Sequence, residues 1–146
     1  METVRHQDII LAIIIRNGYC KPGVNFLTPE HFPQQVAFMR HSSGKIIQAH
    51  LHNPVPREVL STQEVLHIKQ GRLRVDFYDQ HKTYLESRIL RSGDTIVLVG
   101  GGHGFEILDD VEMIEVKQGP YLGDGDKTRF IGIKSSEAVV RESDSE

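Results

Sequence analysis

The sequence predicts an all-β fold, either a sandwich or a barrel. Short apolar segments recur at intervals of roughly 8–12 residues and are separated by turn-forming residues, which is typical of such folds. Residues 72–79 show the strand pattern best, because Leu73, Val75 and Phe77 alternate with polar residues. No segment has the periodicity of a convincing amphipathic helix. These observations together favour sheets packed on one another.

The expected strands can be justified in chain order. Residues 8–16 are rich in β-branched side chains and end at Asn17-Gly18, a strong turn dipeptide. Residues 35–40 and 45–52 flank a second turn around Gly44, which predicts a hairpin. A polar stretch with prolines follows, and Gly71 then separates the strands 63–69 and 72–79. Further turns, at Gly93 and at Asp109-Asp110, divide the remaining expected strands, which are 83–91, 95–99, 103–108 and 111–118.

One folding unit accounts for the whole length. We expect an N-terminal arm and strand over residues 1–34, a β-barrel over 35–119, and a C-terminal strand with an acidic tail over 120–146. The residues from Ser135 to Glu146 are polar and acidic, and we expect them to be frayed. The apolar run 9–15 forms a long edge that needs cover, which a second subunit in a homodimer can provide.

Composition narrows the classes of function. The formal net charge of −3 argues against a general nucleic-acid binder, which usually carries a basic surface. Cys20 is the single cysteine, so no internal disulfide framework is possible and a reducing compartment is indicated. The apolar run 9–15 is too short to span a bilayer and lacks the features of a secretory signal. We therefore expect a cytoplasmic protein that binds neither membranes nor nucleic acid.

Three histidines and one carboxylate suggest a metal site. His50 and His52 lie on the same face of the expected strand 45–52, since residues two apart in a strand point the same way. Glu64 is in phase with two aliphatic residues, so it should point into the barrel, where a lone charge is costly. His103 alternates in phase with Phe105. Such a set suits a divalent metal, and the sequence leaves iron, manganese, nickel, zinc and copper open.

The order of these residues resembles the cupin superfamily, whose first motif is G-x5-H-x-H-x3-4-E-x6-G. Gly44 precedes His50 by five intervening residues, and six residues separate Glu64 from Gly71, as in that motif. Gly93 begins a second motif that leads to His103. The resemblance covers residues 35–118, and the chain is also similar, more loosely, to the small WxcM-like cupins of bacterial surface-polysaccharide pathways.

The chain departs from the cupin pattern in two places. Eleven residues separate His52 from Glu64, where the family has three or four, so residues 53–63 form an insertion. This insertion leaves Glu58 as an alternative carboxylate ligand, although the phase and spacing favour Glu64. In the second motif Val99 replaces proline, His103 arrives one residue early after the glycines 100–102, and the final asparagine has no counterpart.

The resemblance implies a cupin double-stranded β-helix (jelly-roll) barrel with an N-terminal strand extension, often dimeric. It implies a divalent metal held by His50, His52, Glu64 and His103. A metal-dependent enzyme acting on a small polar metabolite is the first expectation, either a dioxygenase or an isomerase of a sugar or oxo-acid.

Two alternatives to that enzyme stay open. One is a non-catalytic small-ligand-binding or accessory protein, and the other is a metal-free nucleotide-sugar isomerase or epimerase with His50 or His103 as base. Arg57 on the insertion and Gln48 beside the histidines are candidate substrate-binding residues, since arginine binds anions in a bidentate manner. No residue is assigned a catalytic role from sequence.

Overall fold

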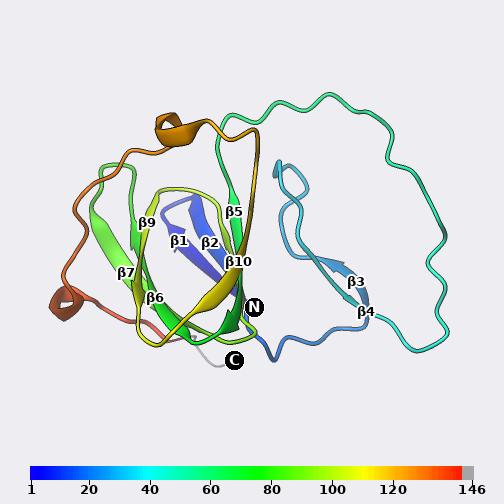
Figure 1. The fold of residues 1–146 in the computed structure, drawn as a ribbon, viewed down its shortest axis with the longest axis horizontal. Helices are drawn as coiled ribbons and strands as arrows, with labels where there is room; N and C mark the ends of the chain where they lie inside the picture. Colours follow the sequence, from blue (N-terminus) through cyan, green and yellow to red (C-terminus); the bar gives the residue numbers. More distant parts are fainter. Residues whose placement is uncertain (143–146) are drawn as a thin grey trace.

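The computed structural model describes residues 1–142 and consists of antiparallel β-structure with two short 3-10 turns (Figure 1). Its strands are β1 (Glu2–His6), β2 (Ile9–Ile15), β3 (Gly23–Phe26), β4 (Ala37–Arg40), β5 (Glu64–Gln70), β6 (Arg72–Tyr78), β7 (Tyr84–Arg91), β8 (Thr95–Leu98), β9 (Gly102–Ile107) and β10 (Glu112–Lys117). The 3-10 turns are η1 (Gly123–Asp126) and η2 (Ser135–Glu137). The predicted all-β class is therefore confirmed.

Two sheets face each other across one core. The five-stranded sheet has the order β1-β2-β8-β5-β10, and the three-stranded sheet has the order β7-β6-β9. Alternate residues of each sheet point inward and pack together, among them Ile14, Leu66, Val75, Phe77 and Leu90. Because apolar burial is the main driving force of folding, this shared core joins the two sheets into a sandwich.

The sandwich does not close into the barrel that the sequence predicted. Strand β9 ends one sheet and β10 ends the other, and within residues 1–142 each pairs with a neighbour on one side only. The turn Leu108–Val111 connects these two edge strands along the chain. The opening of the sandwich therefore lies between β9 and β10.

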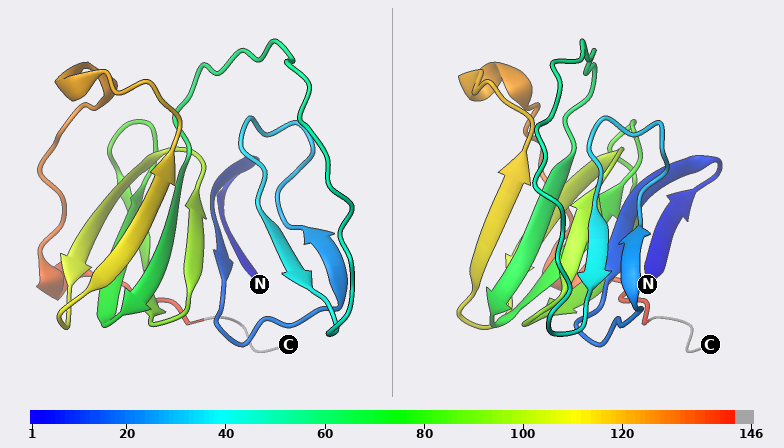
Figure 2. Two further views of the ribbon diagram at one scale, coloured as in Figure 1. Left: turned by 45° about the vertical axis from the view of Figure 1, so that its right-hand side comes forward. Right: turned by 90° about the vertical axis from the view of Figure 1, so that its right-hand side faces the viewer.

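Residues 45–52 do not form the strand that the sequence predicted. The turn before it forms, with Gly44 at a φ of 82° and the Lys45 amide donating to the Ser42 carbonyl at 3.2 Å. The following residues up to Ser61 have no regular structure and are exposed. Strand β4 pairs with β3 instead, and this hairpin lies on the opposite side of the five-stranded sheet from β6, β7 and β9 (Figures 1 and 2).

The other predicted strands have counterparts in β2, β4 to β10, while β1 and β3 were not expected. The apolar run 9–15 is β2, which pairs with β1 on one side and with β8 on the other. Its edges are thus covered by its own chain, and β1 becomes the outer strand of that sheet. Ile13 and Val97, on the outer side, are also buried, and this is the side on which Figure 1 shows the β3–β4 hairpin.

The C-terminal region forms a strap instead of the expected strand. Residues 118–142 carry η1 and η2 and make one isolated bridge, between Val140 and Ser87 of β7. The strap is anchored by two tyrosine hydroxyls, because Tyr78 accepts from the Ile133 amide at 3.0 Å and Tyr84 accepts from the Val139 amide at 2.8 Å. The end of the acidic tail, from Ser143 onwards, lies outside the described residues.

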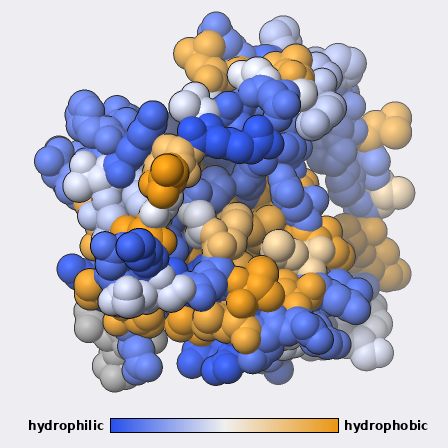
Figure 3. Space-filling model, turned by 60° about the vertical axis from the view of Figure 1, so that its left-hand side comes forward, coloured by the Kyte–Doolittle hydropathy of each residue, from blue (hydrophilic) through white to orange (hydrophobic). Residues whose placement is uncertain are grey.

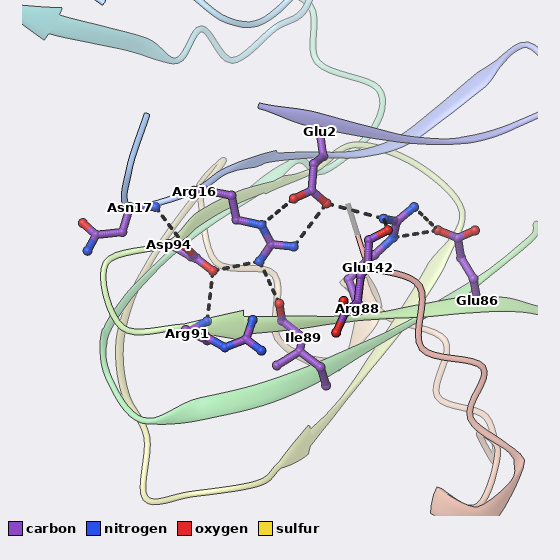
Figure 4. Close-up of polar contacts among 9 residues, drawn as sticks. All are labelled: Glu2, Arg16, Asn17, Glu86, Arg88, Ile89, Arg91, Asp94 and Glu142. Atoms are coloured by element: carbon purple, nitrogen blue, oxygen red, sulfur yellow. Dashed lines mark hydrogen bonds and ion pairs between the residues drawn. The ribbon is translucent and has the colours of Figure 1, made fainter. Parts of the chain in front are cut away.

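A polar network fastens the end of β2 to the turn between β7 and β8 (Figure 4). The Asp94 carboxylate accepts hydrogen bonds from the Asn17 amide at 2.9 Å, from the Arg91 amide at 3.0 Å and from the Arg16 guanidinium at 2.8 Å. Arg16 also pairs with Glu2 of β1. Buried carboxylates need hydrogen-bond partners, and these bonds hold the turn at Gly93 against the end of β2.

No helix within residues 1–142 is long and apolar enough to cross a membrane.

Candidate functional site

The candidate site is built around Glu64 and His103, which lie on opposite sheets. Glu64 begins β5, and the predicted phase is confirmed, because it is 7% exposed and shares its face with the buried Leu66 and Ile68. His103 lies near the start of β9 beside Phe77. The His103 Nε2 is 3.1 Å from the Glu64 Oε2. The sandwich thus brings two residues that are distant in the sequence into hydrogen-bonding contact.

This pairing sets the electrostatics of the carboxylate. The pKa of Glu64 is lowered, mainly by the hydrogen bond from His103 and against the opposing effect of burial. The positive charges of Lys127 and Lys117 contribute in the same direction. Lys127 comes from the C-terminal strap, and its Nζ lies 3.7 Å from the Glu64 Oε1. Glu64 is therefore held as an anion between an imidazole and an ammonium group.

Two cavities meet at His103. A small one of about 50 Å³ lies beside Glu64, Thr62 and the glycines 100 and 101. A larger one of about 380 Å³ lies between β9 and the strap, and its lining includes Tyr78, Thr128, Arg129 and Phe130. A volume in this range fits a small-molecule ligand. The imidazole therefore stands between a buried carboxylate and a ligand-sized space.

The glycine run 100–102 shapes the small cavity. Gly101 has a φ of 66°, and a side chain there would overlap the Tyr78 carbonyl and the Leu11 side chain. Glycine is the residue that adopts this left-handed conformation without strain. The run is thus a tight turn that lets the backbone approach the site.

A buried ion pair between Arg74 and Asp76 lies beside the larger cavity. Asp76 of β6 accepts hydrogen bonds from the Arg74 guanidinium at 2.6 Å and from the Ser87 hydroxyl at 2.5 Å. Arg74 also binds Glu106 of β9 at 2.5 Å. Because Asp76 is fully partnered, its role in the site is to hold β6, β7 and β9 together rather than to react.

The predicted metal ligands form two separate pairs. His50 and His52 have ring centroids 5.1 Å apart, but they lie on the exposed segment 41–63, away from Glu64 and His103. The other candidates on that segment, Gln48, Arg57 and Glu58, are exposed as well. No cluster of three or more histidine, cysteine, aspartate or glutamate residues within residues 1–142 is arranged to hold a metal ion.

The four predicted ligands do not fit a metal in this conformation. The physical reason is that residues 45–52 have no strand partner, so the sheet that was expected to present His50 and His52 to the interior is missing.

The sequence reading missed the residues that the strap contributes. Lys127, Arg129 and Phe130 lie in the region where the sequence predicted a C-terminal strand, and Tyr78 ends β6. The Phe130 and Tyr78 rings pack edge to face with centroids 5.0 Å apart. No periodic pattern could have found these residues, because their position depends on where residues 118–142 return over the sandwich.

Comparison of the chain with protein-family models, with curated proteins and with solved structures finds no match.

Proposed function

We propose that this protein is a small-molecule enzyme that uses His103, oriented by Glu64, for acid–base chemistry. Its reaction is an isomerisation or epimerisation of a polar, anionic metabolite such as a nucleotide sugar. The observation that carries the proposal is the 3.1 Å contact between His103 and the buried Glu64 at the boundary of the 380 Å³ cavity. We extend the proposal to the fold, as a cupin jelly roll, because two facing antiparallel sheets are compatible with it.

The chemistry follows from the pairing. A carboxylate that accepts the Nε2–H of an imidazole fixes its tautomer and leaves Nδ1 free to take a proton. The base removes a proton from a hydroxyl-bearing carbon next to a carbonyl group, which gives an enediol. Return of the proton to the former carbonyl carbon, with the hydroxyl of the first carbon becoming the new carbonyl, gives the isomer. Return of the proton to the first carbon from the opposite face gives the epimer. The net reaction moves one hydrogen within the substrate and needs no oxidant or cofactor.

The surroundings of the cavity support an anionic substrate with a flat group. Phe130 and Tyr78 in its lining offer aromatic surface, and Arg129 adds a positive charge. Lys127, on the same strap, lies outside this lining, beside Glu64. A further cation, Lys82, lies 5.8 Å from the centre of the Phe130 ring. Aromatic surface beside clustered cations is the chemistry that recognises a base and a diphosphate.

A metal-dependent enzyme is the second candidate, either a dioxygenase or an isomerase. It is favoured by the two preformed pairs, His50 with His52 and Glu64 with His103, which together supply the donors that a first-row metal prefers. For this function residues 45–52 must approach β9.

The test is turnover and binding with a panel of nucleotide sugars, measured for the wild type and for His103→Ala. We expect the variant to lose roughly 10²–10⁴-fold in rate, which is the usual contribution of a positioned general base. The matched control is His67→Ala, which changes an exposed histidine on the strand that carries Glu64. It should retain wild-type activity.

Other outcomes separate the alternatives. Near-stoichiometric metal in the purified protein, lost in His50→Ala/His52→Ala, together with activity abolished by chelation, would favour the metal-dependent enzyme. Ligand binding without turnover would point to an accessory binding protein. Equal activity in His103→Ala and His67→Ala would overturn the proposed role of His103.

A further inference from the structure

The opening between β9 and β10 exposes positions that belong to the core. Residues directly opposite in an antiparallel pair have their side chains on the same side of the sheet. Phe105 pairs with Val75 and Ile107 pairs with Leu73, and both partners are fully buried. Yet Phe105 is 39% and Ile107 is 53% exposed. Apolar surface runs across the face seen in Figure 3. This side of the sandwich therefore lacks a cover.

The backbone of β9 is also unpaired on its outer side. In the three-stranded sheet β9 pairs only with β6, so one row of its N–H and C=O groups has no strand partner among the described residues. A free edge beside an apolar face is the arrangement that accepts an added strand.

The segment 41–63 has exposed apolar side chains and no strand to pair with among the described residues. It is apolar at several exposed positions, with Ile46 84% and Leu51 93% exposed, and it has no regular structure. Residues 45–52 have a sequence suited to a strand, since Ile47, Ala49 and Leu51 alternate with Ile46 and Gln48. Such a segment is costly to leave in water, and it can form a strand only where an edge is available.

The two surfaces carry opposite net charge. Residues 41–63 contain two basic side chains, Lys45 and Arg57, against one acidic one, Glu58. Residues 102–117, which carry β9 and β10, contain five carboxylates against one lysine, namely Glu106, Asp109, Asp110, Glu112 and Glu115 against Lys117. The segment 41–63 and residues 102–117 are thus of opposite sign.

The direction of the chain favours a second copy as the occupant. Strand β4 is held by β3 on the far side of the five-stranded sheet, and residues 45–52 leave from there, with that sheet between them and β9 of the same chain (Figures 1 and 2). Reaching their own β9 would require them to pass around the sheet. A second copy can present its β9 edge without any change in the β3–β4 hairpin.

We infer that two copies of this chain exchange the segment 41–63, so that residues 45–52 of each copy form a strand on the β9 edge of the other. The exchange is reciprocal and therefore gives a closed dimer rather than a fibre. It buries the exposed apolar residues of both surfaces and pairs the free edge. This inference concerns assembly and does not rest on the proposed function.

The first test is the mass in solution. Wild-type protein should have twice the mass of one chain by light scattering, and Ala49→Pro should shift it to the mass of a single chain, since proline removes a ladder donor. The matched control is Glu58→Pro, in the same exposed segment but outside the expected strand, which should stay dimeric. A wild-type mass of one chain, or dimers that persist in Ala49→Pro, would overturn the inference.

The second test separates exchange from closure within one chain. Nitrogen-15-labelled and unlabelled protein are unfolded together, refolded and treated with a zero-length carbodiimide, which joins lysines to nearby carboxylates. Mass spectrometry should find Lys45 joined to carboxylates of residues 102–117, such as Asp110 or Glu112, in mixed-label pairs. Cross-links found only between peptides of the same label would show that the segment closes on its own chain. No cross-link between Lys45 and these carboxylates would show that the segment does not reach β9. Either result would contradict the exchange.

Discussion

At the scale of single residues, Glu64 shows how one position serves both folding and chemistry. It occupies an inward-facing position of β5 beside Leu66, where a carboxylate is tolerated only because His103 and Lys127 partner it. The same partners lower the pKa of Glu64 and orient the imidazole. The inward phase of Glu64 was predictable from alternation alone, whereas the identity of its partners depended on which strands face each other.

The lowered pKa of Glu64 makes a contribution to stability that depends on pH. A carboxyl group whose pKa is depressed by folding stabilises the protein fully above its ordinary pKa of about 4.3 and loses this contribution as the pH falls through the folded value. We expect Glu64→Gln to lower the free energy of unfolding by about 1–3 kcal/mol at pH 6. The difference from the wild type should shrink progressively below pH 5.

Urea unfolding of both proteins between pH 3 and pH 7 measures this difference. Glu112→Gln is the control, because Glu112 is an exposed carboxylate that pairs with the exposed Lys69. A difference between wild type and Glu64→Gln that does not change with pH would show that His103 does not pair with the anionic form of Glu64.

At the scale of elements, turns and ion pairs decide how the strands join. Gly71, between β5 and β6, has a φ of 84°, and a side chain there would overlap the Asp110 carbonyl. The turn between β7 and β8 is held by Asp94, which binds Arg16 and the Asn17 amide at the end of β2. Turn positions of this kind could be predicted from glycine and aspartate, but the long-range partner Arg16 could not.

The Asp94 network should be a major source of stability. We expect Asp94→Ala to lower the free energy of unfolding by about 3 kcal/mol, because it removes acceptors for two backbone amides and leaves Arg16 with Glu2 and the Ile89 carbonyl. The comparison variant is Asp109→Ala, whose carboxylate makes an exposed pair with Arg72 and should matter little. Thermal and urea unfolding should therefore show a much larger loss of stability for Asp94→Ala than for Asp109→Ala. Equal losses of stability would contradict the expected contribution of the network.

At the scale of the whole molecule, both sheets end in edge strands, which are β1 and β10 in one sheet and β7 and β9 in the other. Among the described residues, β9 and β10 have free outer edges, and exposed apolar residues such as Ile107 lie beside them. The segment 41–63 stands apart on the opposite side (Figure 1). A single chain of this shape leaves both surfaces in water, and the inferred exchange removes this cost.

Opposite charges on the two surfaces predict a dependence of the exchanged dimer on salt. Two exposed contacts of about 0.5 kcal/mol each, screened at high ionic strength, correspond to roughly a five-fold rise in the dissociation constant. Sedimentation equilibrium at about 0.05 M and 0.5 M sodium chloride measures this change. Tighter association at high salt would show that apolar burial dominates and that the segment 41–63 does not lie against the acidic residues 102–117.

The sequence by itself determined the all-β class, most strand positions, the turns at Gly71 and Gly93, and the inward phase of Glu64. These features follow from alternation and turn chemistry, which act between near neighbours. The prediction of a strand at residues 45–52 was wrong. A strand needs the free edge of another strand to pair with, and a local sequence pattern cannot show whether such an edge lies nearby.

Only the tertiary structure decided that His103 meets Glu64 while His50 and His52 lie elsewhere. Contacts between distant residues depend on how sheets face each other and on the path that the chain takes between them. The same reason explains why the strap, with Lys127 and Phe130 at the candidate site, could not be found from the sequence.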